Sequence, residues 1–344
     1  MTRWFDEAPE KGTAIISSRV RLVRNLDGYV FPSRMTSGES AELIRRLKGG
    51  LRELGSLDGK LYEYLDLAEL GSLEKKALKE RRVINAAAAA KKEPVGLILS
   101  EEEDTGILLN GSDHIRIQAM TSGLNLKELW RQADKADDYI GERFSYAFDE
   151  KYGYLTSFPT NMGTGLRASV ILHLPALSLG KKFNGMVAEM SRFGAAIKGV
   201  YGEGSENYGA LYQVSNQKTL GLSEREILEL VTKVALQLAS QEEQVRKAAM
   251  EKHSLECADE AYKSYGVLKY ARRLSQKDAM TFLSQLMSGV TDGILRFKEP
   301  CSLYRIMLGI QPGNLQLGAD RPLGKEELDE ARAVFVREEL PELI

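Results

Sequence analysis

Cysteine, histidine and long apolar runs are scarce in this chain of 344 residues. The two cysteines, Cys257 and Cys301, exclude a disulfide framework and fit a reducing compartment, so we expect a cytoplasmic protein. No apolar run reaches the ~18 residues of a membrane span, and the first residues have no signal-peptide pattern. The formal net charge of −2 provides no basic field for nucleic acid or a membrane surface. We expect neither partner.

The few potential metal ligands are also poorly placed. No histidine, cysteine and acidic residues share metal-ligand spacing, and the acidic run 101–104 is typical of a solvated turn, so no metal site is predicted. We expect His173, in an apolar strand, to lie in the core. His253, in a charged stretch, is expected to be exposed.

Hydrophobic residues make up 43% of the chain and charged residues 28%, as in a soluble globular protein. The length predicts a large domain, residues 1–248, and a smaller helical one, residues 249–344. Alternation and turn signals predict an α+β fold, with an antiparallel sheet flanked by helices and followed by a helical C-terminal domain. The predicted strands are 13–22, 95–100, 106–110, 114–120, 152–157 and 169–174; the predicted helices are 37–54, 73–81, 126–144, 186–193, a long one from 224, one from 276 and 325–339, with turns at Gly313 and Pro322.

One segment carries the strongest chemical signal. Ser157–Ser169 reads SFPTNMGTGLRAS and places two glycines before an arginine and an apolar strand. Glycines let the backbone approach a ligand closely, and arginine offers a planar fork for phosphate. The pattern fits an anion-binding loop or, as an alternative, a plain turn.

The residue sequence of this segment closely resembles the signature of the ATP:guanidino phosphotransferases, the phosphagen kinase family. Within that family it is most similar to the bacterial protein-arginine kinases of the McsB type. Four further segments match family motifs in family order: Ser17–Asn25 (SSRVRLVRN), Asp113–Gln118 (DHIRIQ), Tyr201–Glu206 (YGEGSE) and Ser215–Gly221 (SNQKTLG).

The resemblance implies a nucleotide site that binds ATP, with Mg²⁺ arriving on the ATP. The family surrounds the nucleotide phosphates with arginines, and arginine suits this role because it stays charged and binds bidentately. Four of these positions match Arg19, Arg21, Arg116 and Arg167. The nucleotide-binding positions carried over are Ser18, Arg19, Val20, Arg21, Leu22, Arg82, Arg116, Arg167, Ala168, Ser169, Lys198 and Gly202.

Several family positions are altered. A carboxylate that orients the guanidinium and accepts its proton matches Glu203, but the second is replaced by Ser112. Asp113 is adjacent and, on a strand, is expected to point to the other face. The family cysteine is replaced by Phe158, and a bidentate arginine by Lys198. Arg82 stands at the position of a nucleotide-contacting histidine.

A second family motif concerns phosphoarginine docking, with the pattern Arg-Asp-x-x-Arg-Ala in the helical domain. Leu328–Ala333 reads LDEARA, so Asp329 and Arg332 are retained and the first arginine is lost to Leu328.

Two functions of different class follow. The first is a protein-arginine kinase with weakened activity, acting on proteins with exposed arginines. By resemblance its partners are a zinc-finger activator and the Clp protease system. We expect a homodimer through C-terminal helices whose apolar face includes Phe282 and Leu286, with an intramolecular core as the alternative for that face. The alternative is a nucleotide-binding pseudokinase acting as an adaptor or regulator. A small-molecule guanidino kinase is a third reading, which the early position of the arginine strand disfavours.

Overall fold

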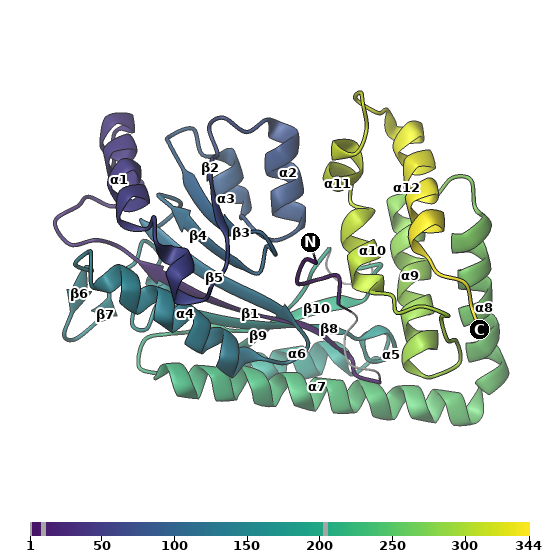
Figure 1. The fold of residues 1–344 in the computed structure, drawn as a ribbon. Helices are drawn as coiled ribbons and strands as arrows, with labels where there is room; N and C mark the ends of the chain where they lie inside the picture. The colour runs from purple at the N-terminus through teal and green to yellow at the C-terminus, as the bar shows by residue number, and fades with distance from the viewer. Residues whose placement is uncertain (1, 8–11, 202–205) are drawn as a thin grey trace.

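An antiparallel sheet forms the centre of the molecule (Figure 1). The computed structural model describes residues 2–7, 12–201 and 206–344. Eight strands lie in the order β2-β3-β4-β5-β1-β8-β10-β9, and every neighbouring pair is antiparallel. The strands are β1 Ile15–Arg24, β2 Tyr62–Asp66, β3 Gly96–Ser100, β4 Thr105–Leu109, β5 Ile115–Ser122, β8 Leu166–His173, β9 Ala195–Gly199 and β10 Leu211–Asn216.

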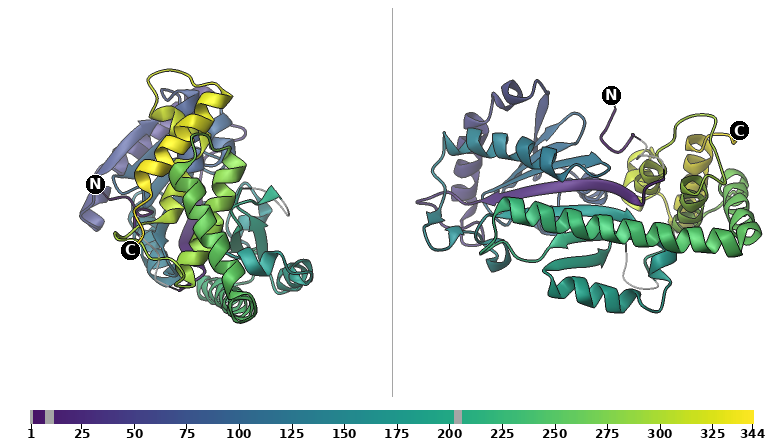
Figure 2. Two further views of the ribbon diagram at one scale, coloured as in Figure 1. Left: turned by 90° about the vertical axis from the view of Figure 1, so that its right-hand side faces the viewer. Right: turned by 90° about the horizontal axis from the view of Figure 1, so that it is seen from below.

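Helices cover one face of this sheet along its whole width. α4, α6 and α7 lie against it, and α7 runs the length of the sheet when the molecule is seen from below (Figure 2). The core here contains Val20, Leu22, Ala168 and Val170 from the strands and Ile140 and Val231 from the helices. The α-helices among the described residues are α1 Ser37–Gly50, α2 Ser72–Glu80, α3 Ala86–Ala90, α4 Leu126–Gly141, α5 Pro175–Ser178, α6 Phe183–Arg192, α7 Glu224–Lys252, α8 Ser254–Tyr270, α9 Gln276–Thr291, α10 Leu303–Gly309, α11 Pro312–Leu317 and α12 Lys325–Glu339.

The opposite face is covered in two separate patches. α2 and α3 pack on β3 and β4 through Leu78, Leu97 and Leu108. The C-terminal helices and the N-terminal residues Trp4 and Phe5 pack on the other ends of the strands. This second core joins Met120 and Ile171 of the sheet to the C-terminal helices, so the helical region shares a core with the sheet.

The structure confirms the α+β class and the helix 325–339, and the predicted strands on either side of the turn at 101–104 form an antiparallel hairpin of β3 and β4. Capping boxes form at Thr36 and Ser223, at the starts of two of the predicted helices. No helix within the described ranges has both the length and the apolar composition that a bilayer crossing requires.

Four local predictions were wrong. The helix from 37 ends at Gly50, before a separate 3₁₀ turn at Leu54–Leu57. The strand 152–157 is reduced to β7, Gly153–Tyr154, paired with β6, Phe148–Asp149. Gly313 lies inside α11. Leu286, expected at a dimer interface, is 0% exposed within its own chain, because α9 packs its apolar side against α8 and α10.

Candidate functional site

The site is a polar stripe on the face of the sheet away from α4 and α7. Side chains alternate along a strand, so Arg19 and Arg21 of β1 lie on one face and Val20 and Leu22 on the other. Pairing of β1 brings neighbouring polar residues beside them, because Arg21 stands opposite Gln118 of β5 and Arg167 of β8. The pairing register of the strands aligns further polar residues with these, so the stripe crosses the five strands β5, β1, β8, β10 and β9. Its residues are Arg19, Arg21, Arg116, Gln118, Arg167, Ser169, Gln213, Ser215 and Lys198.

The stripe lies between the two apolar patches that cover this face. Leu108, opposite Arg116, belongs to the patch under α2 and α3. Met120, two residues beyond Gln118 on β5, belongs to the patch under the C-terminal helices. Positive side chains therefore occupy the part of the face that neither apolar cluster fills.

Three arginines of this stripe keep hydrogen-bond donors that no described residue uses. In the described part of the chain, the Nε atoms of Arg19, Arg21 and Arg116 are buried without a hydrogen-bond partner. Burial, with repulsion from Arg116, Arg82 and Arg167, lowers the pKa of Arg21 to about 9. Burial lowers the pKa of Arg116 to about 10, against an opposing effect of Asp113. Clustered guanidinium groups with unused donors are suited to an anion with several oxygens.

A few neutral groups orient these arginines. The Oε1 atom of Gln213 accepts from Arg19 Nη2 at 3.0 Å and also from Arg82 Nη2. Arg167 donates through Nε to Asn161 Oδ1 at 3.1 Å and through Nη1 to the carbonyl of Asn216. Burial also lowers the pKa of Arg167. Partners without negative charge leave the positive potential of the stripe intact.

Some residues carried over from the nucleotide motif face away from this stripe. Val20, Leu22 and Ala168 are at most 1% exposed and belong to the core under α4 and α7. Ser18 donates to the carbonyl of Gly123 at 2.7 Å. The strand period turns the side chains of these four residues toward the helices and away from the stripe.

The two glycines of the 157–169 segment serve packing. Gly163, with φ of +103°, lies where a Cβ would come within 2.8 Å of Leu220 Cα. Gly165, with φ of +66°, lies where a Cβ would come within 2.6 Å of the Nη1 atom of Arg24. A side chain at either position would collide with protein, so the structure favours the plain-turn interpretation for the glycines themselves.

Arg24, the last residue of β1, is a buried residue beside this loop that sequence reasoning missed. It forms an ion pair of 2.6 Å with Asp137 of α4, donates to the carbonyl of Thr164 at 3.0 Å, and stacks 3.5 Å from the ring centre of Tyr154. Its odd spacing from Arg19 and Arg21 could have shown that it faces the helices. Gln118 and Gln213 were also missed, although Gln118 stands two residues beyond Arg116 and so shares its face.

The loops expected to receive the guanidinium lie beside each other. The Oγ atom of Ser157 donates to the carbonyl of Ser112 at 2.7 Å. The Asp113 carboxylate accepts from Asn25 Nδ2 at 2.8 Å and from the backbone N–H of Ser157 at 2.7 Å. Asp113 lies in a bend before β5, so its expected position on the far face of a strand is wrong.

The remaining expected site residues are placed as follows. Phe158 is 53% exposed, in the loop next to Ser112. Lys198 is exposed on the edge strand β9, opposite Gln213. Gly202 and Glu203 lie outside the described residues.

In the helical region, Arg332 is buried and is already used by its own chain. It donates to the carbonyls of Ile310 and Leu274 at 3.1 and 2.7 Å, and to Asp329 Oδ1 at 2.5 Å. His173 is buried and within 2.7 Å of Ser284 Oγ, as expected for a core histidine, and burial lowers its pKa to about 3. His253 is exposed, as predicted.

The residues present fit an oligophosphate. The Nε atoms of Arg19, Arg21 and Arg116, unpaired among the described residues, supply donors for several oxygens, and Arg167 lies opposite Arg21 on the neighbouring strand. Across residues 2–7, 12–201 and 206–344, no group of three or more His, Cys, Asp or Glu could hold a metal ion. Any divalent ion here would need ligands from the phosphates as well.

Two family models match the chain. The ATP:guanido phosphotransferase C-terminal catalytic domain matches residues 45–245, and the protein-arginine kinase McsB C-terminal domain matches residues 254–343. Among solved structures, lombricine kinase has a TM-score of 0.59 and 26% identity, with 72% of each chain covered. A duplicated taurocyamine kinase from Schistosoma mansoni, solved with bound transition-state-analogue components, has a TM-score of 0.57 and 28% identity over 68% of this chain and 34% of that one.

Curated relatives match over nearly the full length. Protein-arginine kinase of Bacillus mycoides is 41% identical over 98% of this chain and 95% of its own. That of Halalkalibacterium halodurans is 39% identical over 98% and 94%, and that of Bacillus subtilis 37% identical over 99% and 93%. Together with the arginine stripe on the antiparallel sheet, these matches show that the chain belongs to the protein-arginine kinase family.

Proposed function

We propose that this protein transfers the γ-phosphoryl group of ATP to arginine side chains of proteins. The observation that carries the proposal is the stripe of arginines, because the Nε donors of Arg19, Arg21 and Arg116 have no partner among the described residues and neighbouring charges repel Arg21. Phosphoryl transfer depends mainly on positioning and on neutralising oxygens, and Arg19, Arg21, Arg116 and Arg167 supply both. ATP, with its Mg²⁺, brings the phosphoryl group that is transferred.

The acceptor side supports a slow reaction. A guanidinium must be oriented and lose a proton, and Ser112 supplies no carboxylate where the family has one. Phe158 supplies no thiolate, and Lys198 keeps a positive charge but lacks the paired N–H donors with which arginine binds phosphate bidentately. Glu203 is left as the catalytic carboxylate. Loss of a positioned general base reduces a rate by about 10²–10⁴. The alternative, a pseudokinase that binds nucleotide and acts as an adaptor, rests on the same substitutions.

Two measurements on the intact protein test this proposal. Calorimetry with ATP should show binding, and Arg167→Ala should weaken it by about one to two decades, because one charge-assisted contact contributes roughly 1.5–3 kcal/mol. Acid-labile phosphoarginine on a mixed protein substrate then separates kinase from pseudokinase. Equal ATP affinity of the variant and the intact protein would contradict the role of the stripe.

We further propose a cytoplasmic homodimer that assembles through α8. Its exposed residues include Leu255 at 78%, Tyr262 at 56% and Tyr270 at 72%, which recur on one side of the helix at spacings of seven and eight. Large apolar side chains exposed in a row are typical of interaction surfaces. The domain division at residues 248 and 249 falls inside α7, the helix that connects the sheet to α8.

A further inference from the structure

A short turn at the end of α2 joins the C-terminal helices to the arginine stripe. Residues 80–83 form this turn. Glu80 and Arg81 contact α11, a helix 233 residues further along the chain. Arg82 and Val83 contact side chains of the stripe. Four consecutive residues thus connect two regions that are distant in sequence.

Glu80 holds the start of α11. Its carboxylate accepts from the backbone N–H groups of Gly313 and Asn314 at 2.9 and 3.0 Å, and from Asn314 Nδ2 at 3.3 Å. The first N–H groups of a helix have no acceptor within the helix, so Glu80 satisfies donors that would otherwise be unpaired. A Cβ at Gly313 would lie 2.7 Å from the Glu80 carboxylate, which shows how closely the two are packed.

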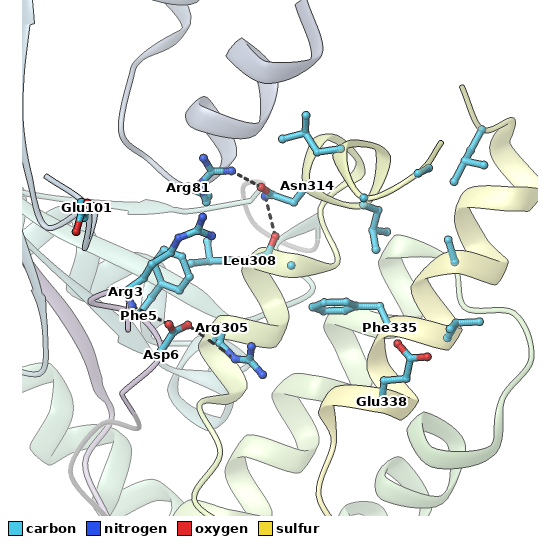
Figure 3. Close-up of a pocket in the computed structure, with 18 residues that line it drawn as sticks. Arg3, Phe5, Asp6, Arg81, Glu101, Arg305, Leu308, Asn314, Phe335 and Glu338 are labelled. Atoms are coloured by element: carbon cyan, nitrogen blue, oxygen red, sulfur yellow. Dashed lines mark hydrogen bonds and ion pairs between the residues drawn. The ribbon is translucent and has the colours of Figure 1, made fainter. Parts of the chain in front are cut away.

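Arg81 adds a second connection to the same helix. Its Nη1 atom donates to Asn314 Oδ1 at 2.9 Å, and Asn314 donates in turn to the carbonyl of Leu308 at 3.0 Å (Figure 3). The other side of the Arg81 guanidinium donates to Glu103 Oε2 at 2.8 Å. With an exposed fraction of 13%, the Arg81 side chain is well enclosed, so this end of the turn is firmly anchored.

The other end of the turn has a strained backbone. Arg82 has φ of +68°, a conformation that residues other than glycine rarely adopt. Such a residue persists where its surroundings determine it. Here the N–H groups of Arg82 and Val83 donate to the carbonyls of Lys79 and Leu78 at 3.0 and 2.9 Å, and the anchors at Glu80 and Arg81 precede it.

This conformation aims three groups at the stripe. The Arg82 side chain donates to Gln213 Oε1, the same atom that accepts from Arg19. The carbonyl of Arg82 accepts from Gln118 Nε2 at 3.0 Å, and that of Val83 accepts from Arg116 Nη2 at 3.4 Å. Moving the turn would therefore shift Arg19 and Arg116.

We propose that Glu80 is a positioning residue for the nucleotide-binding arginines, through which the C-terminal helices act on the site. Glu80 itself contacts α11, and its effect passes through Arg82 and Val83. The inference rests on the proposed function, because nucleotide is the ligand that the arginines hold.

The test compares Glu80→Ala with Glu74→Ala in the full chain. Glu74 is a matched control, an exposed carboxylate that caps the other end of the same helix by accepting from the N–H of Gly71 at 2.7 Å. One measurement is the NMR signal of the Nε–H groups of Arg19 and Arg116 in arginine-labelled protein without nucleotide. The other is the Kd for ATP by calorimetry.

For Glu80→Ala we expect displaced Arg19 and Arg116 signals and a roughly 2- to 30-fold higher Kd. Glu74→Ala should change neither. Glu80→Gln, which keeps one acceptor oxygen, should give intermediate values. Gly313→Ala displaces the Glu80 carboxylate without removing it, and it should shift the same signals and raise the Kd in the same way. It serves as the test variant if Glu80→Ala folds poorly.

Unmoved arginine signals in both Glu80→Ala and Gly313→Ala would overturn the inference. An unchanged Kd in a protein that binds ATP would also overturn it. Displaced signals in a protein that does not bind ATP would support the positioning role of Glu80 while contradicting the proposed function, so the two failures are distinguishable.

Discussion

Replacing Arg21 by methionine should stabilise the nucleotide-free protein while weakening ATP binding. Arg21 lies on β1 among Arg116, Arg82 and Arg167, and burial with their repulsion lowers its pKa to about 9. At about 1.4 kcal/mol per pKa unit, the decrease from 12.5 to about 9 corresponds to an upper bound of roughly 5 kcal/mol against the charged folded state. Solvent screening of the partly exposed side chain reduces this, so we expect a gain of about 1–3 kcal/mol in unfolding free energy.

The sign holds across the neutral range. A cation whose folded pKa is lowered destabilises the fold fully below that pKa, and the penalty fades as pH rises through about 9. The gain from Arg21→Met should therefore be constant between about pH 6 and 8. Urea denaturation measures it, and added ATP should raise the thermal midpoint of the unmodified protein more than that of the variant.

Arg24→Met is the matched control on the same strand. Arg24 is also buried, but it pairs with Asp137 at 2.6 Å, so its removal leaves a buried carboxylate without its cation. Breaking a buried pair this way destabilises by about 3–5 kcal/mol. The two variants should thus change stability in opposite directions. If Arg21→Met destabilised the protein as Arg24→Met does, Arg21 would be a structural residue and the anion-site reasoning would fail.

Three further predictions concern other parts of the molecule. Ser112→Glu with Phe158→Cys, then Lys198→Arg, should raise phosphoarginine formation in steps and more than additively, because the groups act on one transition state; robust activity of the unmodified protein that Glu203→Gln abolishes would show instead that one carboxylate suffices. Burial lowers the pKa of His173 to about 3, so below about pH 6.5 the unfolded state binds a proton that the folded state does not. The free energy of unfolding therefore decreases as the pH is lowered. Between pH 7 and 5 this loss should be about 2 kcal/mol, and His173→Gln should be spared it in urea denaturation at the two pH values. Light scattering at micromolar concentration should find a dimer, and Tyr262→Lys with Tyr270→Lys should convert it to a monomer with an unchanged thermal midpoint; a monomeric unmodified protein would refute the α8 interface.

Local patterns in the sequence were enough to predict which residues share a face. Alternation along β1 is enough to place Arg19 with Arg21, and a short turn at 101–104 between two predicted strands is enough to place β3 beside β4, because both depend only on neighbours in the chain. The same rule would have separated Arg24 and Val20 from the stripe, had it been applied to the whole motif. The motif order was sufficient for the family, which the matches at 37–41% identity confirm.

Tertiary structure alone decided which strands meet and what covers them. Arg21 and Arg167 lie 146 positions apart and become neighbours only because β1 pairs with β8. Leu286 belongs to an amphipathic helix whose apolar side could meet a partner or its own chain, and packing of α9 on α8 and α10 settled that choice. The left-handed backbone of Arg82 is unfavourable locally and is held by contacts of its neighbours with α11. Such outcomes depend on the free energy of the whole packed chain, which no local window of sequence contains.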